Sequence, residues 1–248
     1  MLVRPTSDVS VLPDGIDLRQ GALEDERLPL ESVETVVYCA SMGFGHTPPL
    51  LRQLQAAGVK RGLFVSTTAI FTSLPAASRT PRIEAEAAVQ DSTLDWTILR
   101  PTMIYGTARD RNISRLLRFL ARWPLFPVCG NALWQPIYVD DLADAVVAAL
   151  DNPTTVGRTY NLAGAYPLRF AELVRTAART LAQRVILVRV PVSAAVLAAR
   201  VSRVATPEQV RRLAEDKAFD YAEATRDFGF RPRSFAEGVR LEARALGL

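Results

Sequence analysis

The chain has 248 residues, 49% of them hydrophobic and 23% charged, and a formal net charge of +4. These values suit an ordinary globular protein that can bury one full-sized core. Basic residues are scattered among acidic ones without a lysine–arginine run, so we expect no nucleic-acid partner. No apolar run reaches the roughly eighteen residues that cross a membrane, and the first residues lack a signal-peptide core, so we expect neither stable membrane insertion nor export.

The first half of the chain alternates short β-branched runs with helical segments, a pattern typical of a parallel sheet flanked by helices. The predicted strands are 2–4, 16–19, 35–39, 62–66 and 96–99. Helices are predicted at 48–57, which begins at prolines and ends before Gly58, and at 82–90. Pro101 ends the last of these strands.

The character of the sequence changes after Pro101, where loops and prolines become frequent. The predicted elements there are a helix at 140–150, a strand at 159–162, a helix at 170–181, a strand at 185–190 and a helix at 193–204. We expect most of this part to form a smaller lobe over the sheet edge. The last helix has either a core-packing role in that lobe or a surface role toward a membrane or partner.

The two cysteines, Cys39 and Cys129, lie far apart in apolar surroundings. Neither has the CxxC or histidine spacing of a metal site, so we expect no disulfide and no metal. This cysteine usage fits a reducing compartment, and we expect a cytoplasmic location.

Four segments occur in an order that points to a known family. They are FVST at 64–67, LRPTMIYG at 99–106, QPIYVDDLA at 135–143 and YNLAG at 160–164. Together with the tail at 219–238, this ordered set resembles the extended and atypical short-chain dehydrogenase/reductase superfamily, which includes NAD-dependent epimerases/dehydratases and NmrA-like proteins.

The resemblance implies an α/β fold, a Rossmann-type doubly wound parallel sheet with a smaller C-terminal α/β substrate lobe. Residues 1–106 would form the NAD(P)-binding region, with further sheet contributions from 132–165, and residues 107–248 mainly the substrate-binding lobe. Residues 1–5 match the end of the family's second strand. The first βα unit, roughly thirty residues with the glycine-rich turn that holds the pyrophosphate, is therefore expected to be missing. A start codon assigned too late and a truncated product are both open explanations.

For the cofactor, the resemblance assigns Cys39, Ala40 and Ser41 after one strand, Pro101 and Thr102 after another, and Arg82 on a helix. Arg4 would stand where the family reads the adenosine ribose. A guanidinium there matches a 2′-phosphate, which favours NADP(H) over NAD(H), although a solvated strand-end arginine is the alternative. Leu23 follows Ala22, which replaces the usual adenine-binding Asp, so Leu23 would contact the adenine.

In this family a Ser or Thr, a Tyr and a Lys assist hydride transfer. Ser66 and Thr67 match the first role, but the alignment puts Ser78 at the tyrosine and Arg82 at the lysine. Arg82 can still bind ribose hydroxyls as a fixed cation. Ser78 is either a proton donor or an ordinary helix-start serine.

His46, the single histidine, lies in the loop expected to open over the nicotinamide. It is either a substitute acid or base or a helix-capping residue before Pro48. Tyr105 either shapes the substrate cleft or fills the lobe boundary. Arg109, Arg111 and Asn112 follow on a loop and would meet an anionic substrate such as a nucleotide diphosphate, unless the loop is merely solvated.

These features predict an NAD(P)-dependent oxidoreductase or epimerase-like enzyme acting on a carbonyl or hydroxyl carbon, with a nucleotide sugar as one candidate substrate. The missing Tyr and Lys keep two alternatives open: a non-catalytic NmrA-like sensor of NADP, and an inactive truncated fragment. The expected partner is a small-molecule substrate, and assembly into a homodimer is left open.

Overall fold

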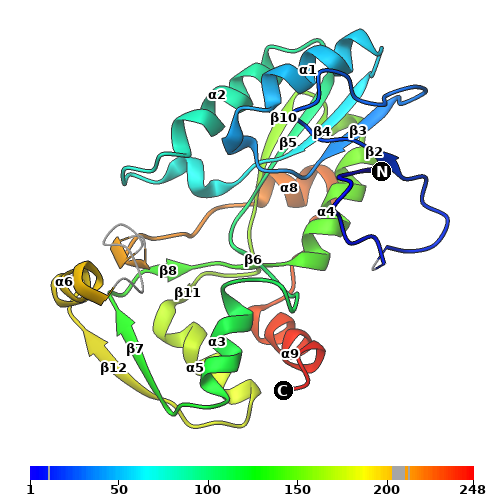
Figure 1. Cartoon of the computed structure of the whole chain (residues 1–248). Helices are drawn as coiled ribbons and strands as arrows, with labels where there is room; N and C mark the ends of the chain where they lie inside the picture. The colour runs from blue at the N-terminus through cyan, green and yellow to red at the C-terminus, as the bar shows by residue number, and fades with distance from the viewer. Residues whose placement is uncertain (11, 203–209, 212) are drawn as a thin grey trace.

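The computed structural model describes residues 1–10, 12–202, 210–211 and 213–248. Figure 1 shows a sheet between two helical layers, with a second lobe below it that carries its own short strands. Helices α1 (Thr47–Ala56) and α2 (Arg79–Gln90) cover one face of the sheet. Helices α4 (Val139–Asp151) and α8 (Ala222–Phe228) cover the other.

The main sheet is parallel and has the strand order β10-β5-β4-β3. Its strands are β3 (Thr35–Tyr38), β4 (Arg61–Val65), β5 (Asp95–Pro101) and β10 (Arg158–Leu162). Neighbouring side chains on β4 and β5 point to opposite faces: Phe64 and Ile98 pack beneath α1 and α2, whereas Leu63 and Leu99 pack against α4 and α8. A sheet buried on both faces needs such continuous apolar strands. The predicted α/β parallel fold is confirmed.

The N-terminal strands β1 (Leu2–Val3) and β2 (Arg19–Gln20) form a separate parallel pair. Within the described residues, no backbone ladder joins this pair to β3. Strand β3 is thus an edge strand, and Val37 on it is 40% exposed. The strand predicted at 16–19 is shifted toward the C-terminus in the structure, where β2 covers Arg19–Gln20.

The second lobe is built from short strand pairs with helices packed against them. Its strands are β6 (Ile104–Tyr105) with β9 (Ile137–Tyr138), β7 (Leu125–Cys129) with β12 (Ile186–Val190), and β8 (Leu133–Trp134) with β11 (Leu168–Arg169). Its helices α3 (Ile113–Leu120), α5 (Phe170–Thr180) and α9 (Phe235–Ala245) share one apolar core.

Helix α6 (Val192–Ser202) corresponds to the helix predicted at 193–204, of which residues 203–204 lie outside the described residues. Val192, Ala195 and Val196 pack against buried Cys129 and Val210. This packing supports the core role for the helix. No described helix has the length and apolar character needed to span a membrane.

Gln135 joins the two lobes at one point. Its carbonyl accepts hydrogen bonds from the Thr102 hydroxyl and the Gly164 N–H, and its side-chain amide donates to the Gly164 carbonyl at 2.8 Å. Its side-chain oxygen accepts the Phe219 N–H at 2.9 Å. One buried residue therefore links the ends of β5 and β10 to the C-terminal part of the chain.

Candidate functional site

The predicted cofactor and catalytic residues follow three neighbouring parallel strands. Residues 39–41 follow β3, Ser66 and Thr67 follow β4, and Pro101 and Thr102 end β5. Because parallel strands end at the same edge of a sheet, these segments lie together where such folds bind ligands. Residues 39–41 are exposed, whereas Pro101 and Thr102 are buried. The exposed turn after β3 and the loop after β4 are therefore the accessible parts of this edge.

Ser66 is engaged in a buried network. Its hydroxyl donates to the Glu86 carboxylate, which also accepts the Arg100 guanidinium, with Nε 3.0 Å from Oε2. A carboxylate only accepts hydrogen bonds, so the Ser66 hydroxyl hydrogen is committed to Glu86. Ser66 can therefore accept a hydrogen bond from a ligand but does not donate one in this arrangement.

Thr67 differs from Ser66 although the two are adjacent. Its hydroxyl accepts the Ala69 N–H at 3.2 Å and thereby caps the 3-10 helix η2 (Thr68–Phe71). An accepting hydroxyl keeps its own hydrogen for donation. Thr67 is half-buried at the sheet edge, so it is the better donor of the pair for a ligand oxygen.

Ser78 and Arg82 contact each other and the loop after β3. Arg82 Nη1 donates to Ser78 Oγ at 2.8 Å. A Cβ added to Gly43 would lie 3.3 Å from Arg82 Nε, so both side chains pack against the 3-10 helix η1 (Met42–Phe44). Ser78 precedes α2 but makes no side-chain capping bond. Helix α2 thus brings a guanidinium to the turn that the family resemblance assigns to the cofactor.

The Glu24 carboxylate lies between Arg4 and His46, the predicted ribose-binding and acid–base residues. Its Oε1 lies 3.4 Å from Arg4 Nη2 and 3.4 Å from His46 Nε2. His46 precedes α1 and makes no side-chain capping bond there. Leu23 is half-buried against the core beneath α1. The acid beside Arg4 reduces the net positive charge at the predicted ribose position.

The four predicted substrate residues divide into one buried and three exposed side chains. Tyr105 is 1% exposed and packs edge-on against Tyr138, with ring centroids 5.5 Å apart. A Cβ on Gly238 would come within 2.1 Å of the Tyr105 hydroxyl oxygen, and Tyr105 belongs to the apolar core of the second lobe. Arg109, Arg111 and Asn112 are exposed, and Arg109 Nη2 lies 3.4 Å from Asp8.

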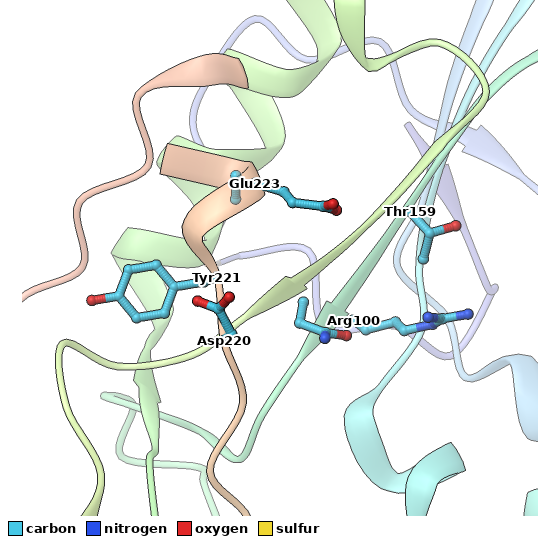
Figure 2. Close-up of a pocket in the computed structure, with 7 residues that line it drawn as sticks. Arg100, Thr159, Asp220, Tyr221 and Glu223 are labelled. Carbon is cyan, nitrogen blue, oxygen red and sulfur yellow. The ribbon is translucent and has the colours of Figure 1, made fainter. Parts of the chain in front are cut away.

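A polar hollow of about 290 Å³ lies between β5, β10 and α8. Figure 2 shows its lining, which comprises Arg100, Thr159, Asn161, Asp220, Tyr221, Glu223 and Ala224. The buried Thr159 Oγ1 and Asn161 Oδ1 have no hydrogen-bond partner among the described residues. Sequence reasoning missed this hollow, although its lining comes partly from the YNLAG and tail motifs. Within the described part of the chain, no cluster of His, Cys, Asp and Glu is arranged to hold a metal.

The sequence model of the NAD dependent epimerase/dehydratase family matches residues 82–163, from α2 to the end of β10. The matched segment includes Arg82, Glu86, Arg100 and Pro101, so it covers the α2 and β5 side of the site.

Two curated relatives match longer stretches of the chain than the family model does. The mitochondrial NADH dehydrogenase (ubiquinone) 1 alpha subcomplex subunit 9 of Arabidopsis thaliana is 34% identical over 110 residues, 43% of this chain and 27% of that protein. UDP-glucose 4-epimerase of Vibrio cholerae is 24% identical over 195 residues, 62% of this chain and 59% of that protein. The matched segments thus span less than two thirds of either relative.

Solved structures share the fold over nearly the whole chain. MoeE5 in complex with UDP-glucuronic acid and NAD has a TM-score of 0.74 at 19% identity, covering 100% of this chain and 91% of that one. RMD from Pseudomonas aeruginosa, complexed with NADPH, has a TM-score of 0.69 at 13% identity, covering 92% and 89%. At these identities the likeness concerns the Rossmann-like fold alone.

Proposed function

We propose that the protein binds a nicotinamide dinucleotide at the carboxyl edge of β3, β4 and β5, and acts on a carbonyl or hydroxyl carbon of a nucleotide sugar or similar polar metabolite. The contact between the Ser78–Arg82 pair and Gly43 carries this proposal, because it puts a fixed cation beside the exposed turn at 39–41. A guanidinium there suits ribose hydroxyls. One relative named as a UDP-glucose 4-epimerase and one structural neighbour solved with UDP-glucuronic acid support the substrate class.

The bound dinucleotide would supply the hydride acceptor, and the chain's own residues would orient the substrate and move its proton. Thr67 would donate its hydroxyl hydrogen to the reacting oxygen. His46, next to Glu24, would take or return the proton. Ser66 would hold the loop in place through Glu86 rather than donate to the substrate.

The cofactor could carry a 2′-phosphate or a free 2′-hydroxyl. The exposed guanidinium of Arg4 favours NADP(H), as the sequence predicts, whereas Glu24 beside it suits a 2′-hydroxyl better. One structural relative was solved with NADPH and another with NAD. We therefore propose NAD(P)(H) and keep NADP(H) as the preference to be tested.

The test is a fluorescence titration with NADH and NADPH, followed by turnover assays on UDP-glucose and UDP-glucuronic acid. The variant His46→Ala with Thr67→Val should lose at least about a hundredfold in kcat/KM, because it removes both the proton carrier and the donor. Thr180→Val, a hydroxyl deletion on distant α5, is the matched control and should keep full activity. Turnover that survives the double substitution would overturn the catalytic assignment.

A second candidate function is a non-catalytic protein that senses the dinucleotide. The commitment of the Ser66 hydroxyl to Glu86 favours it, together with the serine at the family's tyrosine position. A curated relative named as a subunit of NADH dehydrogenase (ubiquinone) is in keeping with it. Tight NAD(P)(H) binding without turnover on any carbonyl or nucleotide-sugar substrate would establish this candidate over the enzyme.

Assembly and location stay predictions. A homodimer would be seen as a doubled mass in sedimentation. A cytoplasmic location agrees with the two free cysteines, whereas the Arabidopsis relative is named as mitochondrial.

A further inference from the structure

Residues 215–219, called the strap here, run between the two lobes. Figure 1 shows this orange segment crossing between the main sheet and the lower lobe before it enters α8. The Lys217 N–H donates to the Leu133 carbonyl at 2.7 Å, and its ammonium lies 3.8 Å from the centre of the Trp134 ring. Phe219 packs on Phe71 at a centroid distance of 5.6 Å. The strap therefore touches both the second lobe and the loop after β4.

At the start of the strap, the Glu215 carboxylate is held by three donors. The Thr72 hydroxyl lies 2.7 and 2.9 Å from its two oxygens, the Ser73 N–H donates at 2.8 Å and the Ser73 hydroxyl lies at 3.1 Å. We call these donors of Thr72 and Ser73 the donor nest. Burial by itself raises the pKa of Glu215, but the nest and the nearby Lys217 charge outweigh it and hold the pKa below its ordinary value.

The donor nest belongs to the candidate site by its position in the chain. It follows directly on η2, which Thr67 caps, at the carboxyl edge of β4. Thr72 is 6% exposed, so its hydroxyl is oriented by its surroundings, whereas Ser73 is exposed and reachable. Convergent N–H and O–H donors of this kind bind phosphate as well as carboxylate. The donor nest thus already holds one internal anion, Glu215, at the end of the loop that follows β4.

We propose that the donor nest binds a phosphate group of the substrate, and that Glu215 is an internal occupant which the substrate displaces. This proposal rests on the proposed nucleotide-sugar substrate. A phosphate offers more acceptor oxygens and more charge than a carboxylate, so it competes well for the same donors. Displacement would free the start of the strap, and substrate binding would thereby loosen one connection between the lobes.

The experiment measures the Kd of UDP by calorimetry for the wild-type chain, Glu215→Gln and Glu215→Ala. Removing the Glu215 carboxylate should tighten UDP binding roughly tenfold, because Glu215 no longer occupies the donor nest for most of the time. The matched control is Glu237→Gln. Glu237 accepts the N–H and hydroxyl of Ser234 at 2.8 and 2.6 Å at the start of α9, so it has similar donors outside the cleft and should leave the Kd unchanged.

The donors are tested by adding Thr72→Val and Ser73→Ala to Glu215→Gln, which should weaken UDP binding about tenfold. Unchanged or weaker UDP binding by both Glu215 variants, including no binding at all, would overturn the proposal, provided that circular dichroism shows them folded. NADH titration of the same samples separates the two ideas. If the Glu215 variants bind UDP more tightly but no sample binds NADH, the proposed dinucleotide function is wrong and the donor nest stands. If NADH binds but UDP binding is not tightened, the donor nest is wrong and the dinucleotide function stands.

Discussion

Two buried carboxylates, one in each lobe, have opposite surroundings. Glu86 on α2 is 3% exposed and accepts the Arg100 guanidinium and the Ser66 hydroxyl. Glu242 on α9 is fully buried, and neither of its oxygens has a hydrogen-bond partner in the described part of the chain. A buried carboxylate is stable when it is paired or when it carries a proton. In the sheet lobe Glu86 is paired with Arg100, whereas in the second lobe Glu242 carries a proton.

The cause of the difference is the neighbouring charge. Burial and the nearby Asp110 carboxyl together raise the pKa of Glu242 to about 9, although the Gly106 N–H opposes the rise. Asp110 itself accepts the Asn112 and Ser114 N–H groups at the start of α3. The second lobe therefore carries a proton on Glu242 at neutral pH, where the sheet lobe carries an ion pair.

The largest expected effect comes from breaking the paired carboxylate. Glu86→Gln should lower the free energy of unfolding by about 3–5 kcal/mol, because Arg100, only 19% exposed in its side chain, would lose its counter-charge. Urea denaturation measures the change. The double variant Glu86→Leu with Arg100→Leu should lose less than the single one, since it leaves no unpaired charge. An equal or larger loss in the double variant would contradict this account of the pair.

A smaller effect is expected from the unpaired carboxylate. Because the folded pKa of Glu242 is raised, its stabilising contribution is full below its ordinary value of 4.5 and is lost as pH rises through about 9. Glu242→Gln should remove this decline and be more stable than the wild-type chain at pH 8 by about 1–3 kcal/mol. Thermal melts from pH 5 to 9 measure it. Parallel stability curves for the two proteins would show that Glu242 does not titrate as described.

The smallest effect on the free energy of unfolding is expected from an exposed ion pair. It is the reference against which the two buried carboxylates are compared. Arg109 and Asp8 lie 3.4 Å apart with side chains 75% and 56% exposed. Arg109→Ala should change the free energy of unfolding by no more than about 0.5 kcal/mol, since water and salt screen such pairs. A change above about 1.5 kcal/mol in urea denaturation would mean that this contact anchors the N-terminal segment.

Much of the secondary structure could be predicted because each element carries its own local signal. The predicted helix at 48–57 is α1, and the strand at 159–162 is β10. Helix α2 begins three residues earlier than the predicted residue 82, at Arg79. The pattern missed β7, which follows Pro124 and contains Pro127, and the two-residue β8, because periodicity gives little signal in such segments.

The side-chain partners in the site could not be predicted, because they are separated in sequence and chosen by packing. The alignment marked Ser66 for hydride chemistry, but the Glu86 acceptor is contributed by α2 across the sheet. No spacing rule relates Glu215 to Thr72, 143 residues apart. The assignments of Ser66, Thr67, His46, Ser78 and Arg82 to catalysis, and of the cofactor and substrate residues, stay predictions.

Gln135 has a mechanical consequence for the whole molecule. Its backbone and side chain together join the ends of two sheet strands to the C-terminal segment. A rocking motion of one lobe against the other would keep these hydrogen bonds only if it turned about Gln135. A motion that separated the two lobes at this point would first have to break these hydrogen bonds.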